Sequence, residues 1–332
     1  MDTQETKHAS AKGGWVAYRP DIRILDCTVR DGGLINDHKF EEDFPRAVYQ
    51  SCVDAGIDYM ELGYKASKKI FSPSEYGKWK FCDEEDVRRV VGDNPTDLKL
   101  SVMADAERTD YKTDILPAEK SVFDCVRVAA YVHQIPLAVD MLKDVYDKGY
   151  EPLMQLMAVS VVAERDMSEA LEILAESPAH AIYIVDSWGA LYSEQVRKLT
   201  GLYMDAVKGT GKEIGFHAHN NQQLAFANTI EAMLAGANRL DATMNGIGRG
   251  PGNCPIELLV GFLHNPKFRL RPILKCCSDT VLPLKQKIEW GYHIPYAITG
   301  LLNQHPREAI KMRAGDNPDD YALFYDQMAE EE

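Results

Sequence analysis

Two histidines and an arginine–aspartate pair are the residues of this chain whose types and spacing could do chemistry. His217 and His219 stand two apart in the run IGFHAHN. On a strand, residues two apart point to the same face, so both imidazoles would be presented together. Arg30 and Asp31 are adjacent in DCTVRDGG, directly after a short apolar run. Two imidazoles and one carboxylate can hold a divalent metal and leave positions open for a substrate.

Each feature also has a purely structural interpretation. The two histidines could form a hydrogen-bonded pair near the surface, and Arg30 could form an ion pair with Glu61. We favour chemistry, because a metal beside a forked, permanently charged guanidinium suits stabilisation of an enolate oxygen or a carboxylate. The donor set suits Mn, Mg, Co, Zn or Fe(II), and the sequence does not choose among them. We expect Gly32 and Gly33 to turn the chain away from this site.

Eight short apolar runs alternate with helical stretches along the chain. Several runs are apolar nearly throughout, which is typical of parallel strands buried on both faces. Apolar residues at three- and four-residue spacing predict helices between the runs, for example at 43–56 and 221–236, each ending at a glycine. The expected strands are residues 22–28, 59–64, 98–105, 125–131, 152–160, 181–187, 214–220 and 239–244.

Eight strand–helix units predict an α/β fold, a TIM (β/α)8 barrel with a C-terminal helical appendage. An open, doubly wound sheet is the structural alternative, since the number of strands does not prove closure. We expect an N-terminal extension at 1–20, the catalytic barrel at 21–265 and a C-terminal helical region at 266–332, where prolines interrupt the pattern.

In such a barrel, catalytic side chains stand at the C-terminal ends of the strands and in the loops that follow. Glu61 and Ser187 occupy such positions and join Arg30 as candidates for substrate binding. The loop NGIGRGPGNCP after the last strand has four glycines in eleven residues, so its backbone can approach a ligand closely. We expect Asn253 of this loop to contact the metal or its water, whereas Cys254 is either a packing residue or a reactive thiol.

Composition restricts the class of protein. The net charge of −14 argues against a nucleic-acid partner, because proteins that bind nucleic acid usually carry a basic surface. No run is apolar enough for a membrane span or a signal peptide, so we expect a cytoplasmic protein without a membrane partner. The seven cysteines include no CxxC pair and are odd in number, so we expect most of them to be free and buried.

These motifs together make the chain resemble the metal-dependent lyase and synthase superfamily built on a TIM barrel. Its members include hydroxymethylglutaryl-CoA lyase, isopropylmalate and homocitrate synthases, and 4-hydroxy-2-oxovalerate aldolase. The resemblance covers most of residues 22–263 and rests on TVRDGG, VDSWGALY and GFHAHNNQQLAFANTIEAMLAGANRLDATMNGIGRGPGNCPIE. The end of the last segment, DATMNGIGRGPGNCPIE, looks most like the loop of the aldolase branch.

By this resemblance the chain is a class II aldolase, a carbon–carbon lyase that cleaves or forms a 4-hydroxy-2-oxo acid through a metal-bound pyruvate-type enolate. Asp31, His217 and His219 correspond to the family's ligands for a divalent metal such as manganese (Mn, Mg, Co or Zn). Asn253 would lie at or just outside the metal shell, and Arg30 corresponds to the arginine that stabilises the enolate. The implied partners are a small-molecule 2-oxo acid and an aldehyde. We also expect a homodimer, with an aldehyde dehydrogenase as a partner enzyme.

The segment GYHIPY resembles the one that brings a catalytic tyrosine to the aldolase active site, which points to Tyr292, with Tyr296 as the alternative. One position departs from the family. Where aldolases of this branch place a histidine as the base for the hydroxyl proton, and the synthases usually a glutamine, this chain has Leu34. The base would then be His38, Asp37, Tyr292 or metal-bound water.

Three other functions stay open at this point. An acyl-CoA-dependent condensing synthase of the isopropylmalate or homocitrate synthase type shares the enolate and adds a thioester partner. A two-histidine, one-carboxylate Fe(II) oxygenase would consume oxygen. A non-enzymatic scaffold with the appendage as a docking module would hold no metal.

Overall fold

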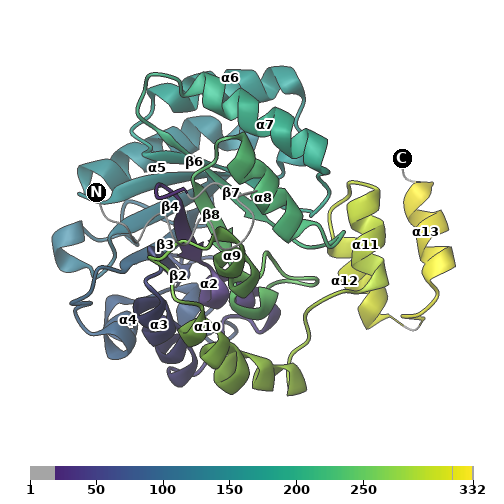
Figure 1. The fold of residues 1–332 in the computed structure, drawn as a ribbon, viewed down its shortest axis with the longest axis horizontal. Helices are drawn as coiled ribbons and strands as arrows, with labels where there is room; N and C mark the ends of the chain where they lie inside the picture. The colour runs from purple at the N-terminus through teal and green to yellow at the C-terminus, as the bar shows by residue number, and fades with distance from the viewer. Residues whose placement is uncertain (1–18, 316, 331–332) are drawn as a thin grey trace, which may run out of the picture.

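The centre of the molecule is a closed barrel of eight parallel strands that follow one another in chain order (Figure 1). The computed structural model describes residues 19–315 and 317–330. The first strand pairs with the second and also with the eighth, which closes the barrel. The predicted TIM barrel is therefore confirmed, and the open sheet is wrong. The strands are β1 (Arg23–Asp26), β2 (Tyr59–Tyr64), β3 (Lys99–Asp105), β4 (Cys125–Ala130), β5 (Glu151–Leu156), β6 (Ala181–Asp186), β7 (Glu213–Ala218) and β8 (Arg239–Ala242).

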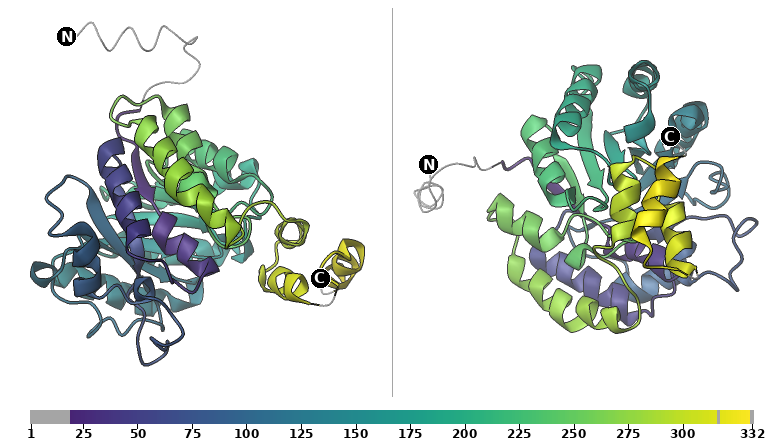
Figure 2. Two further views of the ribbon diagram at one scale, coloured as in Figure 1. Left: turned by 90° about the horizontal axis from the view of Figure 1, so that it is seen from below. Right: turned by 90° about the vertical axis from the view of Figure 1, so that its right-hand side faces the viewer.

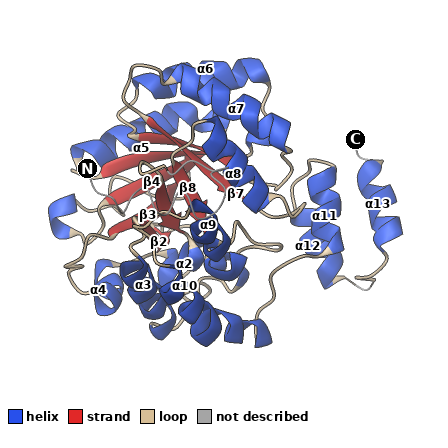
Figure 3. Ribbon diagram, in the orientation of Figure 1, coloured by secondary structure: helices blue, strands red, loops and turns tan. Residues whose placement is uncertain are grey.

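Helices surround the strands on the outside, so the strands are buried on both faces (Figure 3). Every residue of β2, β4 and β6 is buried. In β4, Val126 and Val128 belong to the large apolar cluster under the outer helices. Cys125 belongs instead to the small cluster that fills the barrel. Both sets of alternating positions are thus buried, which is why the strands read as nearly continuous apolar runs.

The outer helices follow the expected pattern with one exception. The helices predicted at 43–56 and 221–236 are confirmed, and the glycines that end them, Gly56 and Gly236, have φ angles of 72° and 122°. Between β3 and β4 the described chain forms turns and a 3-10 helix at Ala118–Lys120 in place of an α-helix. The α-helices around the barrel are α3 (Asp43–Ala55), α4 (Glu84–Val91), α5 (Ile135–Asp147), α6 (Glu164–Glu176), α7 (Ser193–Ala206), α8 (Ala225–Ala235), α9 (Ile256–Leu263) and α10 (Leu270–Cys276).

The exception between β3 and β4 has a local cause. The Asp114 carboxylate accepts the backbone N–H of Asp110, and the hydroxyl of Thr113 donates to the carbonyl of Asp110. Such short polar side chains offer the backbone partners that compete with a helix. Pro117 follows and has no N–H to continue one. The expectation of a helix in every connection is therefore wrong here.

The segment after β1 forms α2 (Thr28–Gly32) and then a 3-10 helix (Gly33–Ile35). Gly32 and Gly33 have helical φ angles of −59° and −61°, so the expected turn at these glycines is wrong. Close packing explains Gly33, because a Cβ atom there would lie 2.2 Å from Nδ1 of His38. Helical geometry carries the residues after β1 across the end of the barrel.

The C-terminal region divides into a part on the barrel and a part beside it. The N–H of Arg269, just before α10, donates to the carbonyl of Ala55 at the end of α3 (2.8 Å). The last three helices stand apart from the barrel in Figure 1 and lie in front of it in the right-hand view of Figure 2. We call α11 (Ile294–Leu301), α12 (Arg307–Ala314) and α13 (Tyr321–Ala329) the appendage.

The predicted boundary at 265–266 stays a prediction. The predicted N-terminal extension lies outside the described residues apart from its last two. All seven cysteines are buried and unpaired, as expected. Within the described part of the chain, no helix combines the length and apolar character needed to cross a membrane.

Candidate active site

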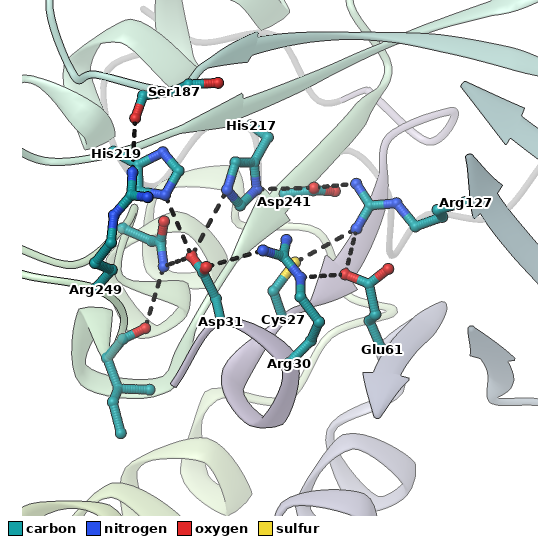
Figure 4. A network of polar contacts seen from close by, with 12 residues as sticks. Cys27, Arg30, Asp31, Glu61, Arg127, Ser187, His217, His219, Asp241 and Arg249 are labelled. Carbon is teal, nitrogen blue, oxygen red and sulfur yellow. Dashed lines mark hydrogen bonds and ion pairs between the residues drawn. The ribbon is translucent and has the colours of Figure 1, made fainter. Parts of the chain in front are cut away.

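Asp31, His217 and His219 meet at the C-terminal end of the barrel (Figure 4). Oδ2 of Asp31 lies 3.7 Å from Nε2 of each histidine, and all three side chains are buried. Asp31 arrives on α2 directly after β1, while β7 and the residue following it present both histidines on one face. The structure thus brings the three predicted ligands together. Metal binding by them stays a prediction.

A second partner fixes which nitrogen of each histidine faces Asp31. Nδ1 of His217 lies 3.0 Å from a carboxylate oxygen of Asp241, and Nδ1 of His219 lies 3.1 Å from the backbone carbonyl of Asp186. A carboxylate and a carbonyl can only accept, so each Nδ1 carries the proton. In the neutral form of each ring, Nε2 therefore presents a lone pair toward Asp31.

The centre contains more hydrogen-bond acceptors than the neighbouring donors satisfy. Nε2 of His217 and Oδ1 of Asn253 are buried and have no hydrogen-bond partner among the described residues. Nδ2 of Asn253 donates to Oδ2 of Asp31 and to the carbonyl of Ile247. Unpaired buried acceptors are costly. A divalent cation would satisfy these atoms, so the residues present fit a metal.

Electrostatics keep Asp31 and His219 in the forms that bind metal. Burial alone would raise the pKa of Asp31, but Arg30, His219 and His217 hold it well below the ordinary value, so the carboxylate is ionised. Burial lowers the pKa of His219 to about 3, so its imidazole is neutral near pH 7. An anionic carboxylate and a neutral imidazole are the forms that bind metal.

A second group of ligand types, Cys27, His217 and Asp241, also lies close together. A guanidinium already occupies the space beside it. Nη2 of Arg127 donates to Asp241, and its Nη1 lies 3.6 Å from Sγ of Cys27. The like charge of Arg127 disfavours a cation at this second group.

Arg30 belongs to a circuit of alternating charges that crosses the barrel (Figure 4). Its Nη1 donates to Asp31 (2.8 Å) and its Nε to Glu61 (2.7 Å). Arg127 donates to the same Glu61 oxygen at 2.8 Å and also to Asp241. Asp241 in turn accepts from the imidazole of His217, which completes the circuit. The ion pair of Arg30 with Glu61 is thus present, and Arg30 also lines the cavity described next.

Sequence reasoning missed Arg127 and Asp241. Both are completely or almost completely buried, and the guanidinium of Arg127 lies 4.7 Å from the ring centroid of Tyr183 inside the barrel. A signal was available, because Arg127 is the single charge of the apolar strand CVRVAA, and Asp241 stands beside Leu240 and Ala242 in the short strand RLDA. A buried charge in such a strand needs a partner from another strand.

A cavity of about 360 Å³ opens over the three predicted ligands. Arg30 and Ser187 line it as expected, and the hydroxyl of Ser187 accepts the N–H of Ala158 (2.9 Å). Glu61 is fully buried and is not one of the lining residues. Leu34 lines the cavity as part of an apolar cluster with Met103.

The structure does not bring Tyr292 to the cavity. The residue is 59% exposed, and Tyr296 is buried against Gly250 and is not one of the lining residues. The appendage contributes His305 to the cavity instead, with its ring 6.1 Å from the ring of Trp188. No sequence signal singled out His305. The predicted role of Tyr292 stays a prediction that this placement does not support.

The other proposed bases also lie off the cavity wall. His38 is buried, and burial lowers its pKa to about 3, while the side chain of Asp37 is 63% exposed. Neither residue lines the cavity. Burial raises the pKa of Cys254 to about 12, so of its two interpretations the structure favours the packing residue over the reactive thiol.

Comparison with curated proteins finds relatives over about three quarters of the chain. An oxaloacetate decarboxylase of Mycobacterium tuberculosis is 31% identical over 246 residues, which are 73% of this chain and 69% of that protein. A 4-hydroxy-2-oxovalerate aldolase of Rhodococcus jostii is 29% identical over 241 residues, 73% of this chain and 70% of that one. These names agree with the predicted lyase class.

Solved structures share the fold. The N-terminal domain of a candidate aldolase from Bacteroides vulgatus is 26% identical, with a TM-score of 0.74 over 87% of this chain and 96% of that one. The HMG-CoA lyase of Brucella melitensis is similar in fold, with 17% identity and a TM-score of 0.62 over 80% of this chain and 99% of that one. The sequence profile of the family described as HMGL-like matches residues 21–277. The chain therefore belongs to the HMGL-like family, as its motifs predicted.

Proposed function

We propose that the protein is a divalent-metal-dependent aldolase that breaks the C3–C4 bond of a 4-hydroxy-2-oxo acid and releases pyruvate and an aldehyde. The observation that carries this proposal is the convergence of Asp31, His217 and His219 beside Arg30 on one cavity. A divalent cation held there would act as a Lewis acid on the 2-oxo group. The aldolases among the relatives support the same reaction.

Arg30 is the residue that would stabilise the enolate left when the bond breaks. Its Nε and Nη1 are held by Glu61 and Asp31, which fix the plane of the guanidinium. Its Nη2 donates to no described residue and is free to donate to a substrate oxygen. A donor that is already oriented stabilises developing negative charge without further reorganisation.

Cleavage by an aldolase requires an acceptor for the proton of the 4-hydroxyl group, and position 34 does not supply one. The alkyl side chain of Leu34 has no atom that accepts a proton, and it packs against an apolar cluster. Loss of CO2 from oxaloacetate also breaks a C3–C4 bond and leaves the pyruvate enolate, but it removes no hydroxyl proton. Leu34 and the decarboxylase relative therefore favour decarboxylation of a 2-oxo dicarboxylate as a second candidate function.

The first proposal is tested by measuring the release of pyruvate from 4-hydroxy-2-oxovalerate by the wild type and by Asp31→Asn. We expect chelation to abolish the activity of the wild type and Mn²⁺ to restore it. We expect Asp31→Asn to lose about 1,000-fold in kcat/KM, because an amide is a poorer ligand than a carboxylate. Asp54→Asn, at an exposed carboxylate of α3, is the matched control and should keep its activity.

Retro-aldol activity of Asp31→Asn after metal repletion would contradict the assignment of Asp31. The two candidate functions are separated by the ratio of kcat/KM values for oxaloacetate decarboxylation and 4-hydroxy-2-oxovalerate cleavage. Release of a free thiol from acyl-CoA in the presence of a 2-oxo acid would instead indicate the condensing synthase.

A further inference from the structure

Lys80 is a buried cation on the cavity wall that has no counter-ion in contact. The residue is 6% exposed and lines the same cavity as the three predicted ligands. Among residues 19–315 and 317–330, no ion pair or side-chain hydrogen bond involves its ammonium. Lysines are almost never buried unless they are paired. The described chain therefore provides neither an ion-pair partner nor a hydrogen-bond acceptor for this ammonium, and a bound molecule could supply one.

Aromatic rings hold the ammonium of Lys80 in place. It lies 4.5 Å from the ring centroid of Tyr64, 4.3 Å from that of Phe71 and 5.7 Å from that of Tyr76. Aromatic faces stabilise the charged form of an amine and orient it. They provide no hydrogen-bond acceptor, so the N–H groups of the ammonium stay available.

The backbone that carries Lys80 is fixed as well. Lys80 ends the 3-10 helix Lys78–Lys80, and the indole of Trp79 within it is fully buried and donates to the carbonyl of Phe40 (2.8 Å). The carbonyl of Lys80 accepts the N–H of Ala66, two residues after β2 (3.1 Å). The ammonium is therefore presented to the cavity from a rigid support.

Lys80 shares the cavity wall with Leu34. Tyr64, Phe71 and Tyr76 pack in one apolar cluster with Leu34. A substrate whose 2-oxo end sits at the predicted metal ligands would pass this apolar wall. Its far end would then meet a cation rather than solvent.

The charged groups nearest to Lys80 act on it without forming an ion pair. Burial lowers the pKa of Lys80, and Asp105 and Arg108 act on it in opposite directions. Burial also raises the pKa of Asp105, and no described atom of Asp105 lies within ion-pair distance of Lys80. Glu107, which also lines the cavity, accepts a hydrogen bond from Gln134 (2.9 Å).

We propose that Lys80 forms an anion-binding subsite that recognises a carboxylate or phosphate at the aldehyde end of the substrate. The preferred acceptor is then an aldehyde that carries a negative group, and the cleaved compound is a 4-hydroxy-2-oxo acid with a second anionic end. The inference rests on the proposed function, because it places the 2-oxo end of the substrate at Asp31, His217 and His219.

Binding tests the subsite without any turnover. Titration calorimetry of the Mn²⁺-loaded protein compares 2-oxoglutarate with 5-methyl-2-oxohexanoate, in which an isopropyl group replaces the second carboxylate. We expect the wild type to bind 2-oxoglutarate about tenfold more tightly, as one charge-assisted hydrogen bond allows. Lys80→Met should lose this preference, whereas Lys80→Arg should keep part of it. Lys78→Met, the same substitution on the same turn at a solvent-facing lysine, is the matched control.

Turnover tests the choice of acceptor. Condensation of pyruvate is compared for succinic semialdehyde against 4-methylpentanal, and for glyceraldehyde 3-phosphate against glyceraldehyde. We expect the wild type to prefer the anionic member of at least one pair, which also tells carboxylate from phosphate. Lys80→Met should lower kcat/KM for that member and leave the neutral member within about twofold of the wild-type value.

Three outcomes would overturn the subsite. The first is a wild type that binds 2-oxoglutarate no better than its neutral analogue. The second is a Lys80→Met variant that keeps the preference but melts at a lower temperature, which would make Lys80 structural. The third is an equal loss of kcat on neutral and anionic acceptors with a shifted pH profile, which would make Lys80 an acid or base. If no aldehyde condenses but the binding preference depends on Lys80, the aldolase proposal fails and the subsite stands.

Discussion

Asp241 sets the chemistry of His217 without reaching the cavity. It accepts the Nδ1 proton of that histidine and is itself held by Arg127. Burial would raise the pKa of Asp241, but Arg127 and His217 outweigh it, so this carboxylate is ionised. The hydrogen bond orients the imidazole and leaves Nε2 free to bind a cation. Such partners usually matter almost as much as the ligands themselves.

The substitution Asp241→Asn tests whether this carboxylate strengthens metal binding by His217. The amide can still accept from His217, but it lacks the charge that makes the imidazole a strong donor to metal. We expect the affinity for Mn²⁺, measured by titration calorimetry, to fall by about 10- to 100-fold. Asp26→Asn alters another buried carboxylate, one that bonds to Thr28 and not to the site, and should leave the affinity unchanged. Equal affinities of the two variants for Mn²⁺ would count against this role of Asp241.

The appendage stands beside the barrel, yet it contributes a residue to the cavity. Gln222, after β7, donates to the carbonyl of Gly300 in α11, and a Cβ atom on Gly300 would lie 2.9 Å from that of Asn221. This close contact seats α11 against the loop that follows the histidines. The seat holds His305 over the cavity mouth beside Trp188.

Gly300→Val should loosen this seat, because a branched side chain does not fit beside Asn221. We expect kcat/KM to fall by about 10- to 100-fold through misplacement of the cavity wall, while the affinity for Mn²⁺ stays at the wild-type value. Gly201→Val in α7 meets nothing within 4 Å and controls for the loss of a helical glycine. If the Gly300 variant has normal kinetics, the appendage does not shape the substrate site.

At the scale of the whole molecule, the site joins parts of the barrel that are distant in sequence. Asp31 follows the first strand, His217 lies in the seventh with His219 directly after it, and Asn253 follows the eighth. The backbone adds to this junction, because His219 and Asn253 form an antiparallel bridge. A bound cation would therefore tie the first and last strands of the barrel together and resist unfolding.

Metal should accordingly stabilise the fold against urea. We expect the free energy of unfolding to rise by about 2.7 kcal/mol when free Mn²⁺ is 100 times its dissociation constant. The measurement is the urea midpoint with Mn²⁺ or with a chelator, at constant pH. Asp31→Asn should show no increment from Mn²⁺. An increment of the same size in that variant would mean that the cation binds somewhere else.

The sequence alone determined parallel strands covered by helices, because strands that are apolar on both faces have few other arrangements. Closure of the sheet into a barrel was decided by the pairing of β1 with β8 in the structure. The sequence also determined which ligand types share the site, since strand alternation places His217 and His219 on one face and the strand-end rule brings Asp31 to them.

Only the tertiary structure decided what surrounds these ligands. Arg127 and Asp241 meet across the barrel, and Lys80 and His305 reach the cavity from segments without a regular pattern. Tyr292 matched a motif yet stays in solvent. Periodicity reports which face of an element a residue occupies, whereas contacts between distant loops depend on how the elements pack.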